Sequence, residues 1–128
     1  MSYYTNKTLE GTFDQVVEKV TNALKEEGFG VLSDIDVSAT LKKKLDVNFR
    51  KYRILGACNP PNAHKALTAE PYIGLMLPCN VVVQETDDGK VDVSAVNPVA
   101  SMTAVENSEL ERVASNIKEK LERVINNL

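Results

Sequence analysis

The strongest constraint on the fold is a pair of long amphipathic segments, one near each end of the chain. In residues 12–27 the apolar side chains recur at helical spacing, and residues 108–128 show the same pattern with charged residues on the opposite face. Each segment predicts a helix with one apolar face. Such a face must be buried against another layer of secondary structure, so the rest of the chain has to supply that layer.

Local signals mark where these two helices begin and end. Thr12 and Gln15 are spaced as a capping box, in which each side chain bonds a backbone N–H group at the start of a helix. Ser108 and Glu111 repeat this spacing at the start of the C-terminal segment. Gly28 fits the left-handed position that commonly closes a helix.

The segments between the two helices favour β-strands and short helices, because β-branched and aromatic residues are enriched in them or alternate with polar residues. Strands are expected over residues 3–9, 29–36, 49–57, 75–83 and the run after Asp87-Asp88-Gly89, with short helices over 37–45 and 60–70 and a connecting piece over 98–103. The order is β-α-β-(short α)-β-(short α)-β-β-α, with no internal repeat or linker. It predicts an α+β fold, a single two-layer domain over residues 1–128. Two long helices would cover one face of a twisted, mainly antiparallel sheet.

The turn Asp87-Asp88-Gly89 sets the register of the last two strands. A two-residue loop would place Val83 opposite a serine, which would mix apolar and polar side chains on one face. A three-residue loop with Gly89 in a left-handed conformation places Val83 opposite Val93 and keeps the apolar residues together. Since a slip of one residue would reverse both faces, we expect the three-residue loop.

Composition excludes several classes of protein. The net charge of −3 and the pI near 5.2 argue against a nucleic-acid partner, which requires a clustered basic surface. No apolar run approaches the roughly 18 residues of a membrane span, and the N-terminus lacks the features of a signal peptide. We therefore expect a cytoplasmic protein with reduced thiols, no membrane partner and no cofactor required by any motif.

Two Cys-Asn dipeptides carry the best candidates for chemistry. The chain has two cysteines and one histidine, which lie in the strings Cys58-Asn59-Pro60-Pro61-Asn62-Ala63-His64 and Pro78-Cys79-Asn80. Asn59 is a favourable N-cap and Pro60 fits a first helical turn, so Cys58 precedes a helix N-terminus. The positive end of the helix dipole would stabilise a thiolate, and backbone N–H groups there could hold a small anion such as sulfate, phosphate or a carboxylate.

Each of these residues also has a purely structural interpretation. Free cysteine is often a small buried apolar residue, and Cys79 shares the apolar face of its strand with Val81. His64 lies roughly 8–9 Å along the helix from Cys58 and on another side of it, which makes a direct Cys–His pair awkward. We expect His64 to be partly exposed.

A metal site formed by Cys58, His64 and Cys79 is an alternative, because zinc and copper accept these ligands. The spacing matches no standard zinc motif. The alternative depends on where the fourth strand begins. A start near Ile73 would separate the two thiols by about 16 Å along neighbouring strands, whereas a start at Cys79 would let them approach.

Several strings resemble the small bacterial and archaeal family known as domain of unknown function 302. They are Gly28-Phe29-Gly30-Val31-Leu32, Ala57-Cys58-Asn59-Pro60, Ala63-His64-Lys65-Ala66-Leu67 and Leu77-Pro78-Cys79-Asn80-Val81-Val82-Val83. The resemblance covers nearly the whole chain. It implies a β-α-β4-α fold like half of the TATA-binding protein, commonly seen as a dimer, and no settled activity. Its motif positions form a candidate pocket: Cys58, Asn59, Pro60, His64, Pro78, Cys79 and Asn80.

Three functions remain open at this stage. The first is a pocket around Cys58, with Cys79 nearby, that handles a small anionic or sulfur-containing ligand. The second is the metal-binding module. The third is a non-catalytic interaction domain, in which the sheet face left bare by the helices forms a homodimer.

Overall fold

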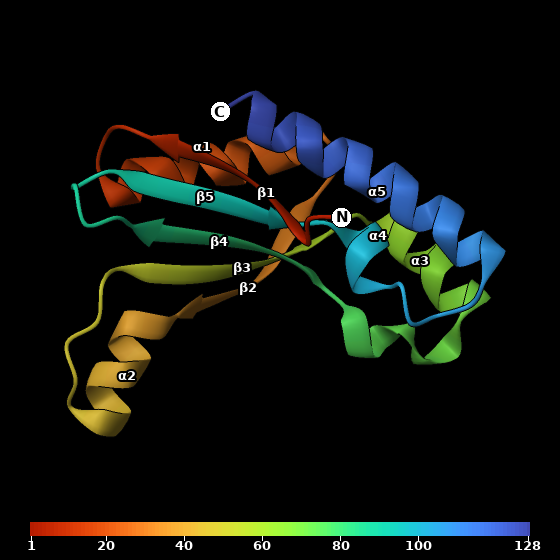
Figure 1. Cartoon of the computed structure of the whole chain (residues 1–128), viewed down its shortest axis with the longest axis horizontal. Coiled ribbons are helices and arrows are strands. Elements are labelled where there is room, and N and C mark those ends of the chain that lie inside the picture. Colours follow the sequence, from red (N-terminus) through yellow and green to blue (C-terminus); the bar gives the residue numbers. More distant parts are fainter.

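Five strands form one antiparallel sheet in the order β1-β5-β4-β3-β2 in the computed structural model, which describes residues 1–128 (Figure 1). The strands are β1 (Tyr4–Leu9), β2 (Gly30–Asp36), β3 (Tyr52–Cys58), β4 (Cys79–Glu85) and β5 (Val91–Val96). Every neighbouring pair is antiparallel. The predicted α+β class with an open antiparallel sheet is confirmed, and the element order is compatible with the β-α-β4-α arrangement.

Two long helices, α1 and α5, pack against one face of this sheet, as the amphipathic patterns predict. The helices are α1 (Phe13–Glu26), α2 (Val37–Leu45), α3 (Pro60–Ala69), α4 (Pro98–Ser101) and α5 (Ser108–Asn126), with a 3-10 helix η1 (Pro71–Met76). The main core joins fully buried residues of α1 and α5, such as Leu24 and Leu121, to alternate residues of β4 and β5. Each such side chain stabilises the fold by roughly 1.5–3 kcal/mol.

The register of the β4–β5 hairpin agrees with the three-residue loop. Val83 lies opposite Val93, and Val81 lies opposite Ala95. Gly89 has a φ of +79°, which is the left-handed conformation that this loop requires. All four apolar side chains are therefore on the core face, where their exposure is zero.

The predicted start of β4 is wrong for residues 75–78. The stretch before Cys79 forms the 3-10 helix η1, in which the Ile73 N–H donates to Glu70 O at 3.1 Å and the Leu77 N–H donates to Gly74 O at 3.2 Å. Pro78 has no N–H to give to a sheet ladder, which opposes strand pairing before Cys79. The third strand also begins later than predicted, at Tyr52 instead of residue 49.

The two long helices begin in different ways. The capping box of Thr12 and Gln15 is present, with both reciprocal bonds at 3.2 Å. The second predicted box is wrong, because Asn107 occupies the N-cap and Ser108 is already the first helical residue. The Asn107 Oδ1 atom accepts from the backbone N–H groups of Glu109 and Leu110 at 3.0 and 3.2 Å. Asparagine is a strong N-cap, and here it displaces the serine that follows it.

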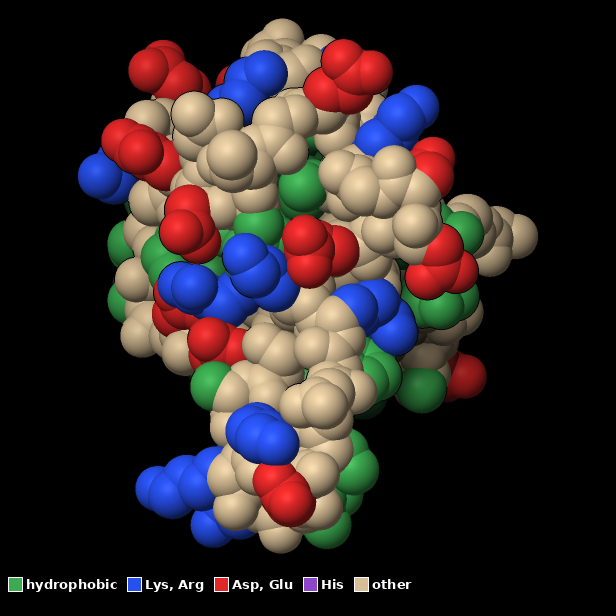
Figure 2. Space-filling view, turned by 90° about the vertical axis from the view of Figure 1, so that its left-hand side faces the viewer, with side chains coloured by type: hydrophobic (Ala, Val, Ile, Leu, Met, Phe, Trp, Pro, Cys, Tyr) green, Lys and Arg blue, Asp and Glu red, His purple; other side chains and the backbone are tan.

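Helix α2 stands away from the sheet beyond the end of β2, and none of its residues is buried. Seen from that end, α2 forms a separate lobe with basic side chains on one side and hydrophobic ones on the other (Figure 2). The apolar side chains Leu45, Val47 and Phe49, on α2 and the segment after it, are more than two-fifths exposed. The Arg50 guanidinium lies over the Phe49 ring, 4.4 Å from its centroid, and covers part of this apolar surface. No helix is both long and apolar enough to cross a membrane.

Candidate functional site

Both cysteines line a single cavity of about 320 Å³, which we call the thiol cavity. It lies where β3 ends and β4 begins, between the end of the sheet, α3 and η1. The lining residues are Phe29, Leu32, Ala57, Cys58, Asn59, Ala63, Leu67, Gly74, Leu77, Pro78, Cys79 and Ile117. None of them carries a charge.

Strand register brings the two cysteines to this cavity. Cys79 pairs with Ala57, and Cys58 is the next residue along β3. This arrangement follows from the start of β4 at Cys79 and removes the 16 Å separation that an earlier start would have imposed. Cys79 is 5% exposed and belongs to the main core, whereas Cys58 is only partly buried. The two thiols therefore line the same cavity but differ in their exposure to solvent.

A bulge in β2 adds an apolar wall to the thiol cavity. Val31 pairs with Ala57 and Ser33 pairs with Gly56, so Leu32 is an extra residue without a partner in β3. Its side chain lines the cavity and is 72% exposed. A large aliphatic side chain at the mouth of an apolar cavity suits a ligand that is itself apolar.

Close packing around Gly56 fixes the position of Pro78 in the cavity wall. A Cβ atom at residue 56 would lie 2.7 Å from Pro78 Cγ and would also collide with Ser33 Oγ. The Leu77–Pro78 peptide bond is cis. Glycine is thus required at residue 56 by the approach of two side chains and not by its backbone angles.

Asn59 has a structural role beside the cavity. Its side chain is 8% exposed, and its Oδ1 atom accepts from the Asn62 N–H at 3.3 Å as the N-cap of α3. Its Nδ2 group donates to Glu27 O at 3.2 Å, at the end of α1. Asn59 therefore ties the end of one helix to the beginning of another.

The first turn of α3, residues 60–63, has no free backbone donor, which corrects the expectation of an anion beside Cys58. Pro60 and Pro61 carry no N–H, and the Asn62 N–H is bonded to the cap. The next N–H, from Ala63, donates to Asn59 O at 2.8 Å. An anion needs several free N–H groups at a helix start, and the first turn of this helix offers none.

Burial controls the chemistry of Cys79. Loss of solvent, together with a smaller effect of the Cys58 thiol, raises the pKa of Cys79 to about 11. A thiol with that pKa is protonated at neutral pH and is a poor nucleophile, since the thiolate is the reactive form. Of the two cysteines, Cys58 is thus the one that can react from solvent.

Three of the motif residues lie outside the thiol cavity. His64 is exposed and lines a separate groove between α3 and α5. Asn80 is exposed on the bare face of the sheet, and Pro60 is exposed at the first turn of α3. No group of three or more His, Cys, Asp or Glu side chains is placed to hold a metal ion. The proposed set of Cys58, His64 and Cys79 is therefore not assembled.

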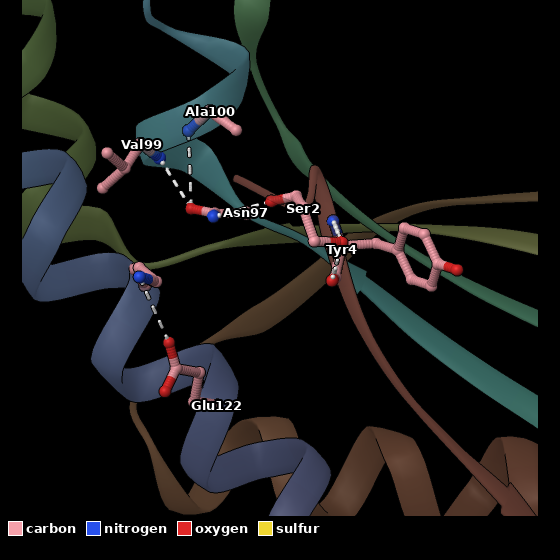
Figure 3. Close-up of polar contacts among 7 residues, drawn as sticks. Ser2, Tyr4, Asn97, Val99, Ala100 and Glu122 are labelled. Atoms are coloured by element: carbon pink, nitrogen blue, oxygen red, sulfur yellow. Dashed lines mark hydrogen bonds and ion pairs between the residues drawn. The ribbon is translucent and has the colours of Figure 1, made fainter.

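Another buried asparagine, Asn97, is also structural. Its Oδ1 atom accepts from the N–H groups of Val99 and Ala100, and its Nδ2 group donates to Ser2 O at 3.0 Å (Figure 3). It caps α4 and fastens the N-terminal residues to the end of β5. The buried asparagines thus hold elements together, and no buried side-chain polar atom lacks a partner.

The pocket predicted from the sequence includes four residues of the thiol cavity, Cys58, Asn59, Pro78 and Cys79, and lacks the large aliphatic side chains of its wall. These side chains are Leu32 of β2, Leu67 of α3, Leu77 between η1 and β4, and Ile117 of α5, and no spacing in the sequence links them. Three of them, Leu32, Leu67 and Leu77, lie within the strings that resemble the family, so only Ile117 has no such signal.

Comparison with known proteins identifies the family. The family described as domain of unknown function DUF302 matches residues 5–128. The chain belongs to this family. A solved structure, the uncharacterized conserved protein DUF302 from Bacillus stearothermophilus, is 25% identical, covers 98% of both chains and has a TM-score of 0.91. A search of the curated proteins finds no match. DUF302 membership confirms the resemblance in the motif strings and supplies no activity.

Proposed function

We propose that the thiol cavity binds a small apolar or sulfur-containing molecule, and that Cys58 is the thiol that reacts with it. The observation that carries this proposal is that both cysteines line one cavity of about 320 Å³ without a charged wall. Small-molecule sites are typically concave and mostly apolar, with volumes of about 300–1,000 Å³. The thiol cavity is at the lower end of that range, which favours a small ligand.

Thiol–disulfide exchange is the reaction that this pair of thiols supports best. The Cys58 thiol gives its proton to water, and the resulting thiolate attacks one sulfur of a ligand disulfide. The ligand's S–S bond breaks, and its second sulfur leaves as a thiolate that takes up a proton. The product is a mixed disulfide on Cys58, and no further oxidant is consumed. Cys79, neutral and buried, forms the inner wall.

Exchange with diethyl disulfide tests the reactive role of Cys58. We expect one mixed disulfide per chain at pH 7.5, on Cys58, because Cys79 is buried and protonated. Intact mass and peptide mapping measure the extent and the site. Modification of both thiols at equal rates in the folded chain, or of neither, would contradict the proposal.

Reversible binding tests the cavity separately from its chemistry. Diethyl sulfide has the same apolar parts and cannot exchange, so methyl NMR shifts report occupancy alone. Ala63→Leu should abolish binding, because Ala63 lines the cavity and a leucine would fill it. Ala39→Leu makes the same change on exposed α2 and should leave binding intact. Equal affinity in both variants would exclude the thiol cavity as the site.

We also propose that the chain forms a homodimer through the end of the sheet that carries α2. The support is the exposed apolar group Ile35, Leu45, Val47 and Phe49, at 41% to 67% exposure, on a lobe that buries none of its helical residues. Charges of both signs lie at the same end, with Lys42–Lys44 on α2 and Asp87 and Asp88 in the β4–β5 turn (Figure 1). A two-fold contact needs such a self-complementary surface.

Light scattering on the purified chain tests the dimer. Phe49→Ser should shift the population toward monomer, because it removes an aromatic side chain from the apolar group. Leu75→Ser is the matched control: Leu75 is 84% exposed on η1, away from α2. A monomeric wild-type chain at millimolar concentration would rule the dimer out.

A further inference from the structure

A groove of about 530 Å³ runs between α3 and α5, on the side of α3 that faces away from the thiol cavity. We call it the cationic groove. Its charged and polar wall comprises His64, Lys65 and Thr68 of α3, and Glu109, Arg112 and Asn116 of α5. Ala63 and Leu67, on another side of α3, line the thiol cavity. The two sites therefore lie on the same helix but have no lining residue in common.

The cations of this groove have no partner within the chain. The salt bridges of the structure join Lys42 to Asp46, Arg53 to Asp34, Lys118 to Glu122 and Arg123 to Glu27. Lys65 and Arg112 form none, and Glu109, the single acid in the groove, forms none either. In a chain with a net charge of −3, the two unpaired cations outnumber the one acid, so the groove carries a local excess of one positive charge.

A chain of amides that is buried at Asn59 and Asn62 and exposed at Asn116 holds one wall of the groove in place. Asn62 is 7% exposed, and its Nδ2 group donates to Asn59 Oδ1 at 3.0 Å and to Asn116 Oδ1 at 3.1 Å. Asn59 is in turn bonded to Glu27 O. With its oxygen engaged, Asn116 is left with its Nδ2 group as a donor that has no partner in the chain. The amide wall is thus fixed before any ligand arrives.

We propose that the cationic groove binds a phosphate group. Arg112 presents the planar fork that pairs with phosphate oxygens, Lys65 adds a second positive charge, and Asn116 supplies a neutral donor. The volume exceeds that of a phosphate ion, so the ligand class that fits is a phosphate monoester of a small molecule. This site is separate from the thiol cavity and does not depend on the function proposed for it.

NMR titration of the whole chain at constant ionic strength tests the groove. The probes are inorganic phosphate and phenyl phosphate, each up to about 20 mM, well above a millimolar Kd. We expect saturable shifts confined to α3 and α5, with phenyl phosphate binding more tightly. If inorganic phosphate bound more tightly than phenyl phosphate, the ligand would be the free ion and not a monoester. The groove would still be the phosphate site.

Charge variants decide whether the groove is the site. Arg112→Gln and Lys65→Gln should each weaken binding about fivefold, and Glu109→Gln should tighten it about twofold. Lys118→Gln removes a charge from the same helix outside the groove, where Lys118 pairs with Glu122 at 3.7 Å, and should change nothing. Absence of saturable shifts, or equal weakening in Lys118→Gln, would overturn the proposal.

Discussion

At the scale of single residues, burial makes the two cysteines chemically different. Cys79 packs in the core opposite Ala57, and Cys58 is partly exposed at the end of the same cavity. The sequence predicts both positions, since Cys79 alternates with core valines and Cys58 precedes a proline-initiated helix. It does not predict that the first turn of this helix has no free N–H group. That outcome depends on the Asn59 side chain turning back onto Asn62.

The raised pKa of Cys79 predicts a loss of stability at high pH. The unfolded thiol ionises near pH 8.5, whereas the folded one ionises at about 11. Between these values the unfolded chain has lost a proton that the native chain retains, so the free energy of unfolding should fall by about 1.4 kcal/mol per pH unit. The full contribution is present below about pH 8.5 and is lost as pH rises to about 11.

Urea unfolding from pH 8 to 11 measures this loss. Tyrosine and lysine side chains also titrate in this range, so the quantity to compare is the difference between wild type and Cys79→Ala. The alanine variant should be less stable at pH 8 and should show a shallower decline. Cys58→Ala should keep the wild-type slope. Identical slopes for all three chains would contradict the raised pKa.

Gly56 offers a second test at the residue scale. Gly56→Ala should destabilise the fold by about 1–3 kcal/mol, because the new methyl group would collide with Ser33 and Pro78. Gly30→Ala is the matched control on the neighbouring strand, where a Cβ atom meets nothing within 4 Å, and it should be nearly neutral. Thermal unfolding compares the two. Similar effects would mean that the packing around Gly56 is looser than described.

At the scale of elements, local signals predict helix starts well when one cap stands alone. Thr12 has no competitor and forms the expected capping box. Ser108 follows another capping residue, Asn107, which takes its place. The alternation of residues 75–78 wrongly predicts a strand there, because a second local signal competes with it. Strand periodicity extends back through Leu75, whereas the prolines around this stretch favour the 3-10 helix that forms.

Asn59 should contribute more to stability than an exposed cap does. Asn59→Ala removes both the cap of α3 and the bond to Glu27 O in a buried site, and we expect a loss of about 2–3 kcal/mol. Thr12→Ala removes an exposed cap and should cost about 1 kcal/mol. Urea unfolding at pH 7 measures both. An equal cost would argue against Asn59 as the tie between α1 and α3.

At the scale of the whole molecule, the thiol cavity forms where segments that are distant in the sequence pack together. Its wall combines β2, β3, β4, α3, η1 and α5. Sequence patterns predict the layers, the strand order along the chain and the hairpin register, because each depends on neighbouring residues. They also place Cys58, Asn59, Pro78 and Cys79 at a pocket, but they do not predict its full wall, because the β2 bulge at Leu32 and the turn of η1 are set by packing between distant segments.

A crystal structure under xenon pressure tests the central claim most directly, because xenon enters apolar cavities and is located by its strong scattering. The account predicts a xenon atom in contact with the side chains of both Cys58 and Cys79, and its loss in Ala63→Leu. Wild-type crystals without xenon at this position, with the two thiols opening into separate spaces, would contradict it.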